Sequence, residues 1–227
     1  MTLDHPLVKD FSDQLSQFVK EVCQDRDDSH GHNHMQKVAS TSLKIFIEIF
    51  GDIIPTNLDI AKLTLMVAWL HDVNDHKYHN DQLAFKLKDF IHMHSPNNVD
   101  LILKIIQHIS YSTEVKLMQS NNNKKVDFDK ILGATGSMVR DIVSDADKLE
   151  ALGSIGLERC IDYQKHLFYQ KHQTEIPIEI LKQETKQHAE EKLLRLSDHF
   201  IRTSMGKKLA QPLHDEFVLA LNQFLSL

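Results

Sequence analysis

The chain has 227 residues with 41% hydrophobic content, which is enough to bury one sizeable core and excludes a disordered protein. The formal net charge of −6 excludes a general basic field for duplex nucleic acid or anionic membranes, and the two cysteines exclude a disulfide framework. The first ten residues show no signal-peptide pattern and the longest apolar run, Leu63 to Leu70, is too short for a membrane helix, so we expect a soluble cytoplasmic protein.

Apolar residues recur at intervals of three and four along most of the chain, while glycine and proline are scarce. This pattern predicts an all-α bundle that forms a single domain over residues 1–227, with helices at Pro6 to Cys23, His34 to Phe50, Leu58 to Asp72, Asn80 to His94, Asn97 to Ile109, Gly136 to Ala151, Gly153 to Gln170, Ile178 to Thr203 and Leu209 to Leu227. The polar stretch Gln119 to Asp127 is interpreted as an exposed loop inserted in one domain, with a domain boundary as the alternative. The polar helices over residues 171–227 are expected at the periphery.

The segment MVAWLHDVNDHKY, residues 66–78, places ionisable side chains at the end of an apolar helix. His71 and Asp72 follow the apolar run directly, so we expect them to be half buried. A buried carboxylate is costly unless it is paired or bound to a metal, and a structural ion pair is the alternative to a metal site. A second pair, His214 and Asp215, lies in the polar C-terminal part and is interpreted as solvated.

The histidine-rich stretch SHGHNHMQKV, residues 29–38, is a second candidate group. His30 and His34 are four residues apart, and they share a face if the turn before His34 is helical. Imidazole and carboxylate groups together form a normal ligand set for Mn²⁺, Fe²⁺, Zn²⁺ or Mg²⁺. An exposed histidine-rich loop that binds metals only adventitiously is the alternative interpretation.

The third group is IVSDADKLEALGSIGLERC, residues 142–160. Helical periodicity predicts Asp147 on an inward face among small and apolar residues, where a carboxylate needs a cation. By contrast, Asp145, Lys148 and Glu150 by themselves fit a solvated helical face. The two glycines of GSIGLE each cost about 1 kcal/mol relative to alanine in a helix, which indicates a close approach of the backbone to a neighbour or a ligand.

The order and spacing of these three groups resemble the HD-domain superfamily of metal-dependent phosphohydrolases. A histidine heads one helix, a His-Asp pair follows 37 residues later, and an aspartate in DADKLEALG lies 75 residues beyond the pair. Within the superfamily, AWLHDVNDHKY and SDADKLEALGSIGLERC are most similar to the small bacterial-type branch that contains nucleoside triphosphate pyrophosphohydrolases. The resemblance covers a motif core at residues 29–160 and implies a helical bundle of the HD-domain type.

The resemblance also implies a metal centre. One divalent ion is expected, with Mn²⁺ as the first choice and Mg²⁺, Fe²⁺, Ni²⁺ or Zn²⁺ as alternatives, and its implied ligands are His34, His71, Asp72 and Asp147. Two positions depart from the branch. Gly31 stands where an aspartate is common, and Lys37 replaces a common arginine. Neither change removes a ligand, although both alter the pocket.

The remaining implied roles concern water and phosphate. Catalysis is assigned to Asp75, which would orient or deprotonate the attacking water, and to Lys148, a point charge for phosphate oxygens. Substrate binding is assigned to Lys77, His30, His108 and Arg159. Such a site supports hydrolysis of a phosphate ester or anhydride, because a divalent ion lowers the pKa of water and neutralises phosphate charge.

The expected substrate is a nucleoside triphosphate, in particular a deoxynucleotide, cleaved to monophosphate and pyrophosphate. Two lysines beside the metal-binding segments, Lys77 and Lys148, spread the positive charge that a triphosphate needs. The alternatives are a 5′-nucleotidase that acts on monophosphates, a nucleotide-sensing module without turnover, and a purely structural scaffold. The expected partners are small phosphate esters or nucleotides, with no nucleic acid and no membrane, and the C-terminal helices leave a homodimer open.

Overall fold

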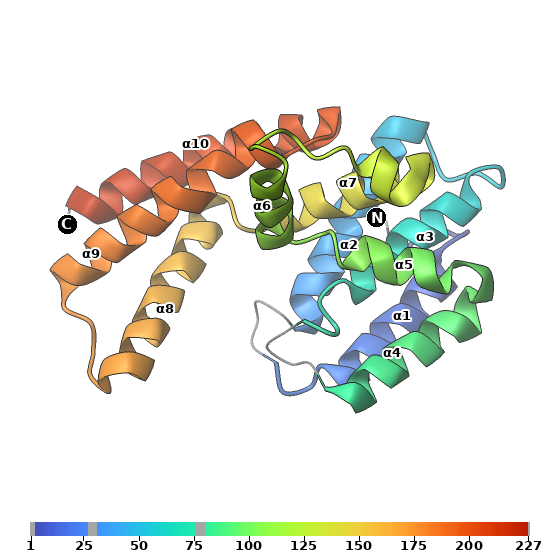
Figure 1. Cartoon of the computed structure of the whole chain (residues 1–227), viewed down its shortest axis with the longest axis horizontal. Coiled ribbons are helices and arrows are strands. Elements are labelled where there is room, and N and C mark those ends of the chain that lie inside the picture. The colour runs from blue at the N-terminus through green and yellow to red at the C-terminus, as the bar shows by residue number, and fades with distance from the viewer. Residues whose placement is uncertain (1–2, 27–30, 76–79, 227) are drawn as a thin grey trace. The chain divides into compact units, whose positions relative to one another are not determined.

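The structure is a computed structural model of the whole chain, and it describes residues 3–26, 31–75 and 80–226 (Figure 1). Every regular element in these ranges is a helix, which confirms the predicted all-α fold. The chain forms two compact units, Met1–Ala146 and Asp147–Leu227. The single domain over residues 1–227, with its motif core at 29–160 and peripheral helices at 171–227, stays a prediction.

The first unit is built around one helix, α3 Leu58–Leu70, whose C-terminal half is buried. Its elements are α1 Lys9–Val22, α2 His32–Phe50, α3 Leu58–Leu70, α4 Asp81–His94, the 3₁₀ turn η1 Pro96–Asn98, α5 Val99–Ile106, α6 Tyr111–Ser120 and the greater part of α7 Phe128–Leu149. Helix α3 packs against α1, α2 and α5, and every residue from Thr64 to Leu70 is buried. Because each fully buried large apolar side chain stabilises the fold by about 1.5–3 kcal/mol, this helix is a rigid support for the residues that follow it.

Capping side chains explain where several helices begin. The side-chain oxygen of Asn80 accepts from the Leu83 amide at the start of α4, and Ser110 accepts from the Thr113 amide at the start of α6. Helix α6 was not predicted. The predicted loop Gln119 to Asp127 begins at the last turn of this helix and lies within the first unit, so it is not the boundary between the two units.

Helix α7, which spans the end of the first unit, has a break that we did not predict from the sequence. Gly133 lies inside it with a φ of 71°, a left-handed conformation that glycine adopts without strain. The segment before the break, which starts at Phe128, was not predicted, whereas the segment after Gly133 corresponds to the helix predicted over Gly136 to Ala151.

The second unit contains α8 Gly153–His172, α9 Ile178–His188, the π-helical turns Ala189–Leu193 and Leu196–Phe200, and α10 Ser204–Ser226. The helix predicted over Ile178 to Thr203 is confirmed as far as Phe200, where α9 continues through two π-helical turns before the extended residue Ile201. Helix α10 packs against α8 and α9. The predicted close approach of the GSIGLE backbone to a neighbouring group is confirmed at Gly156. A Cβ built on this glycine would lie 2.4 Å from the backbone oxygen of Ala151.

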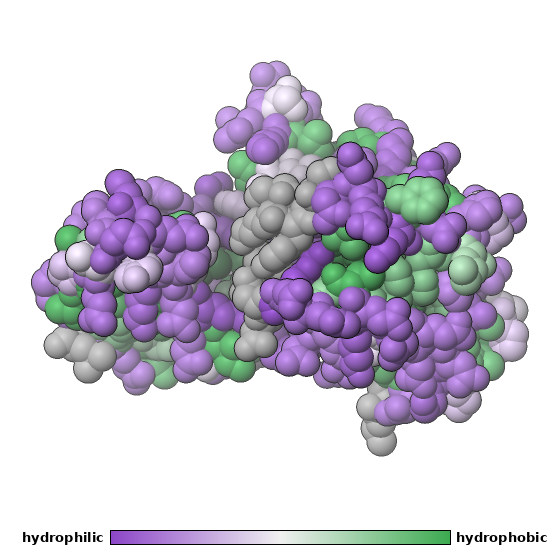
Figure 2. All heavy atoms as spheres, turned by 90° about the horizontal axis from the view of Figure 1, so that it is seen from below, coloured by the Kyte–Doolittle hydropathy of each residue, from purple (hydrophilic) through white to green (hydrophobic). Residues whose placement is uncertain are grey.

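Polar side chains cover most of the face that Figure 2 shows, in agreement with the 26% of charged residues. Among the described residues, no helix has the length and the hydropathy that crossing a membrane would require.

Candidate metal centre

Two packed helices bring the first three predicted ligands together. His34 lies in the first turn of α2, which begins after the extended N-cap residue Gly31. His71 is the C-cap residue of α3, and Asp72 follows it in the turn. Helices α2 and α3 pack against each other along much of their length, so residues far apart in sequence meet at one place.

The three side chains converge on a small space. The Nε2 atoms of His34 and His71 lie 3.3 Å apart, and each lies 3.7 Å from Oδ2 of Asp72. One ligand atom from each residue falls within 4.8 Å of the other two. Both imidazoles are buried, whereas the Asp72 side chain keeps 22% of its exposure. The group is therefore held by the core on the histidine side and is accessible from solvent on the carboxylate side.

The chemistry of these donors fits a divalent cation. The Nδ1–H group of His71 donates to the backbone oxygen of Ala68 at 2.8 Å, so its Nε2 carries a lone pair that faces His34 and Asp72. A hydrogen bond of this kind on the second ring nitrogen is the usual arrangement in metal-ligating histidines. Two imidazoles and one carboxylate are normal ligands for Mn²⁺, Fe²⁺ or Zn²⁺. The structure thus brings three of the four predicted ligands, His34, His71 and Asp72, into one group that could hold a metal ion.

A residue that the sequence did not reveal holds the turn behind Asp72. Arg26 lies just after α1, and its guanidinium donates to the backbone oxygen of Asp72 at 2.6 Å and to that of Val73. In the sequence, Arg26 stands in the charged stretch QDRDD, where an arginine is typical of a solvated surface. No local pattern marks a side chain that bonds to backbone 46 residues away.

The turn after α3 also carries Asp75. Its amide donates to the Asp72 backbone oxygen at 3.2 Å, which closes a tight turn, and the residue is half-buried. The proposed work of Asp75 on water stays a prediction. Lys77 and His30, both assigned to substrate binding, lie outside the described residues.

The C-terminal part of α7 differs from the predicted pattern of exposure. Asp145 is fully buried and Lys148 is nearly so, whereas Asp147 is half-buried. The interpretation of Asp145 and Lys148 as part of a solvated face was therefore wrong, because α7 is enclosed on several sides at this level and all residues from Ile142 to Ala146 are buried.

Three assigned residues belong to the second unit, and their roles stay predictions. Asp147 is the first residue of that unit, and it follows Ala146 directly along α7. Lys148 comes next on the same helix. Arg159 lies on α8, where its Nη1 donates to the Glu150 backbone oxygen at 3.3 Å and lies 3.9 Å from Glu150 Oε2.

His108 lies in the first unit, just after α5. Its Nδ1–H donates to the Lys104 oxygen at 2.7 Å, and its ring meets that of Phe128 edge to face, with centroids 6.0 Å apart. These contacts fix the orientation of the imidazole and leave Nε2 as its acceptor atom. The assignment of His108 to substrate binding stays a prediction.

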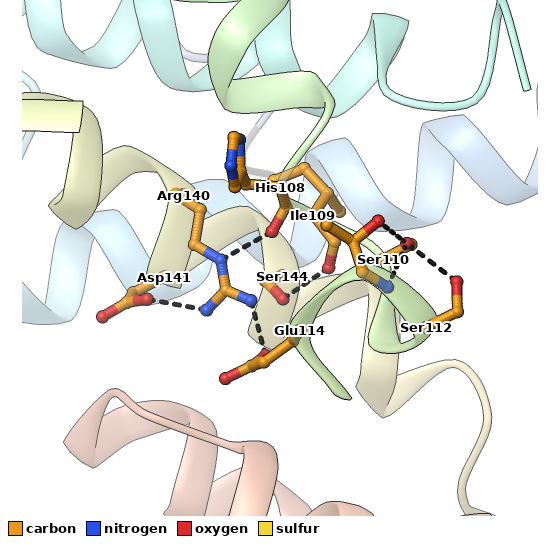
Figure 3. Close-up of polar contacts among 9 residues, drawn as sticks. His108, Ile109, Ser110, Ser112, Glu114, Arg140, Asp141 and Ser144 are labelled. Carbon is orange, nitrogen blue, oxygen red and sulfur yellow. Dashed lines mark hydrogen bonds and ion pairs between the residues drawn. The ribbon is translucent and has the colours of Figure 1, made fainter. Parts of the chain in front are cut away.

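A buried arginine on α7 supports the segment that carries His108 (Figure 3). Arg140 donates from Nε to the His108 oxygen at 2.8 Å and from Nη2 to Glu114 Oε2 at 2.5 Å. Its Nη1 donates to Asp141 at 2.9 Å, and its guanidinium lies 3.9 Å from the centroid of the Phe128 ring. Arg140 thus joins α7, the turn after α5 and helix α6 into one rigid cluster.

The second His-Asp pair is unlike the first. His214 is half-buried, and its Nδ1 lies 2.9 Å from Ser197 Oγ. It is therefore less exposed to solvent than the sequence predicted. Asp215 is exposed and accepts from Gln211. Neither residue belongs to the group that could hold a metal among the described residues.

Solved structures share this fold, although a scan of protein-family models and a search of curated proteins found no match. An HD-superfamily hydrolase from Bacillus thuringiensis is 22% identical, with a TM-score of 0.62 over 96% of each chain. A Lactobacillus plantarum protein is 22% identical, with a TM-score of 0.65 over 96% of each chain. Bacillus subtilis YpgQ in complex with ADP is 20% identical, with a TM-score of 0.61 over 95% of this chain and 93% of that one.

These likenesses establish the fold class. The chain has the helical fold of an HD-superfamily protein along nearly its whole length, which confirms the fold that the three motifs predicted. In this chain the His-Asp pair directly follows α3, with His71 as the C-cap residue of that helix.

Proposed function

We propose that the protein is a metal-dependent phosphohydrolase. The observation that carries the proposal is the convergence of His34, His71 and Asp72 within 4.8 Å of one another in a fold shared with an HD-superfamily hydrolase. Asp147 is proposed as the fourth ligand. The rigid core on the histidine side and the open carboxylate side suit a site that must bind a cation firmly and still admit a substrate.

A divalent cation held here would supply Lewis-acid chemistry, since it polarises phosphate and lowers the pKa of water. The residues of the chain provide the rest. Asp75, in the turn after Asp72, would accept the proton of the attacking water. Lys148 and Lys77 would neutralise phosphate oxygens, while His30, His108 and Arg159 would contact the remainder of the substrate. Mn²⁺ is the proposed ion.

The proposed substrate is a nucleoside triphosphate, in particular a deoxynucleotide. Water would attack the α-phosphorus, the bond to the αβ bridging oxygen would break, and monophosphate and pyrophosphate would leave. The fold neighbour from Bacillus subtilis was crystallised with ADP, a molecule that carries the same αβ anhydride. This supports a nucleotide as the ligand class. Because the protein has a net charge of −6, the positive charge that a triphosphate needs would come locally from Lys77 and Lys148.

Product analysis tests the proposal. The purified protein is incubated with mono-, di- and triphosphates of several nucleosides, with Mn²⁺ or with EDTA, and products are separated by anion exchange. We expect pyrophosphate to appear in step with monophosphate, only in the presence of metal. Asp72→Asn should abolish the reaction, and His214→Ala, outside the metal group, should retain it.

Two results would contradict parts of the proposal. Orthophosphate released from monophosphates, with triphosphates left intact, would overturn the substrate and favour a 5′-nucleotidase. A protein that holds metal and binds nucleotides but turns over none of them would overturn the enzyme and favour a sensing module.

A further inference from the structure

Arg26 connects the end of α1 to the metal-binding turn. Its backbone lies in a turn that closes α1, where its amide donates to the Cys23 oxygen at 3.3 Å. From there the guanidinium reaches the turn after α3 and donates to two consecutive backbone oxygens, those of Asp72 and Val73. One side chain thus fixes the two peptide groups that flank the Cα of Val73 and carry the chain out of the His-Asp pair.

The geometry is the one that arginine is suited to. The last carbonyl groups of a helix and of the turn after it have no intrahelical partner, and a planar guanidinium presents parallel N–H groups that can satisfy two of them at once. Charged donors form shorter and stronger hydrogen bonds than neutral ones. A lysine carries the same charge, but its single ammonium group lacks the planar arrangement of N–H donors that can bond to two carbonyl oxygens at once.

The base of this connection is itself well held. Helix α1 packs on α3, where Trp69 Nε1 donates to Ser12 Oγ at 3.2 Å in the core. Leu15 and Val19 of α1 are fully buried. Arg26 therefore extends from a fixed helix, and its guanidinium resists movement of the Asp72 backbone.

We infer that Arg26 is a positioning residue for the metal centre, acting through the backbone of the turn that carries Asp72. By holding the Asp72 carbonyl, Arg26 keeps the carboxylate oxygen 3.7 Å from the Nε2 atoms of His34 and His71. The inference rests on the metal centre of the proposed function. It adds a residue outside the ligand set, which lies in a different segment of the chain from all of the predicted ligands.

The test measures Mn²⁺ affinity directly, by counting free Mn²⁺ with electron paramagnetic resonance during titration of the metal-free protein. The variants are Arg26→Ala and Arg26→Lys, and Lys20→Ala is the matched control, because it removes an exposed positive charge near the end of the same helix. The melting temperature of each metal-free protein is measured in parallel. Guanidinium at millimolar concentration, below its denaturing range, is then added to each sample.

We expect Arg26→Ala to bind Mn²⁺ about 10–100-fold more weakly, as is typical when a group that supports a ligand is removed. Its metal-free melting temperature should stay within about 4 °C of the parent protein. Added guanidinium should restore part of the lost affinity, Arg26→Lys should remain weaker than the parent, and Lys20→Ala should match the parent.

Four outcomes would overturn the inference. Parent-like Mn²⁺ affinity in Arg26→Ala would do so. A loss of Mn²⁺ affinity that guanidinium does not restore would also do so, if the melting temperature of the metal-free variant falls by more than about 4 °C. Should Arg26→Ala fail to fold, Arg26→Lys decides, and parent-like affinity in that variant refutes the role of the fork. A parent protein that binds no Mn²⁺ at all instead overturns the metal centre itself, and this inference with it.

Discussion

Replacing Arg140 by methionine should strongly destabilise the first unit. The ion pair between Arg140 and Glu114 is almost completely buried, with side chains 0% and 1% exposed. Methionine keeps most of the apolar volume of the arginine stem but removes the charge and the three nitrogen atoms that donate hydrogen bonds here. The Glu114 carboxylate then stays in the core without its guanidinium.

The contacts of the guanidinium set the magnitude. Breaking a buried ion pair by removing one partner costs about 3–5 kcal/mol, because the remaining charge is left in a medium of low dielectric. The loss of the hydrogen bond from Arg140 Nε to the His108 backbone oxygen lowers the stability further. A loss of this size is a large fraction of the 5–15 kcal/mol by which a typical domain is stable, so we expect Arg140→Met to shift the urea midpoint of unfolding far downward.

The assay is urea unfolding followed by circular dichroism, applied to a double-mutant cycle. Arg140→Met with Glu114→Met should recover much of the loss, because a buried pair replaced by apolar side chains is often close to neutral. Lys165→Met, which breaks an exposed pair with Asp162, is the control and should change stability by less than about 1 kcal/mol. A cost below about 1 kcal/mol for Arg140→Met, or a double mutant as unstable as the two single changes added together, would refute this reasoning.

Four further predictions concern single residues. Asp75→Asn should keep the metal while turnover falls by about two orders of magnitude or more, and unchanged turnover would assign Asp75 a structural role. Burial raises the pKa of the Cys160 thiol to about 11, so at pH 8 it should react with Ellman's reagent far more slowly in the folded than in the unfolded protein. Burial lowers the pKa of His188 below its ordinary 6.5, so the folded state binds this proton less readily than the unfolded state. Stability from His188 is therefore present above pH 6.5 and lost as the pH falls below it, and His188→Gln should flatten urea midpoints measured across that range; an unchanged slope would contradict this. Gly156→Ala should lower the melting temperature, because its Cβ would lie 2.4 Å from the Ala151 oxygen, and an unchanged value would show that the start of α8 can shift freely.

The helices that bury an apolar stripe were predictable from the sequence. Helix α3 was expected from Leu58 to Asp72 and runs over Leu58–Leu70, because the continuous burial from Thr64 to Leu70 leaves a strong apolar signal. Helix α6 was missed for the opposite reason. The only buried residue of this helix is Glu114, which is held by Arg140, so its stability depends on a tertiary ion pair that no local spacing reveals.

The same contrast holds at the candidate site. The proximity of His34, His71 and Asp72 was predictable, because residues at fixed positions on two packed helices leave a fixed spacing in the sequence. Arg26 was not predictable, since an arginine that bonds to backbone oxygens leaves no pattern in the partner residues, and any amino acid there offers the same carbonyl group. Asp145 was misinterpreted because a helix enclosed on several sides loses the polar face on which periodicity depends.

The metal content of the purified protein tests the central claim most directly. Inductively coupled plasma mass spectrometry should find one divalent ion per chain in the parent protein after dialysis, and the same amount in His214→Ala. His71→Ala and Asp147→Ala should each lose that ion while keeping the helical circular dichroism spectrum. A folded His71→Ala variant that still holds a full equivalent of metal would contradict the assignment of this group as the metal centre.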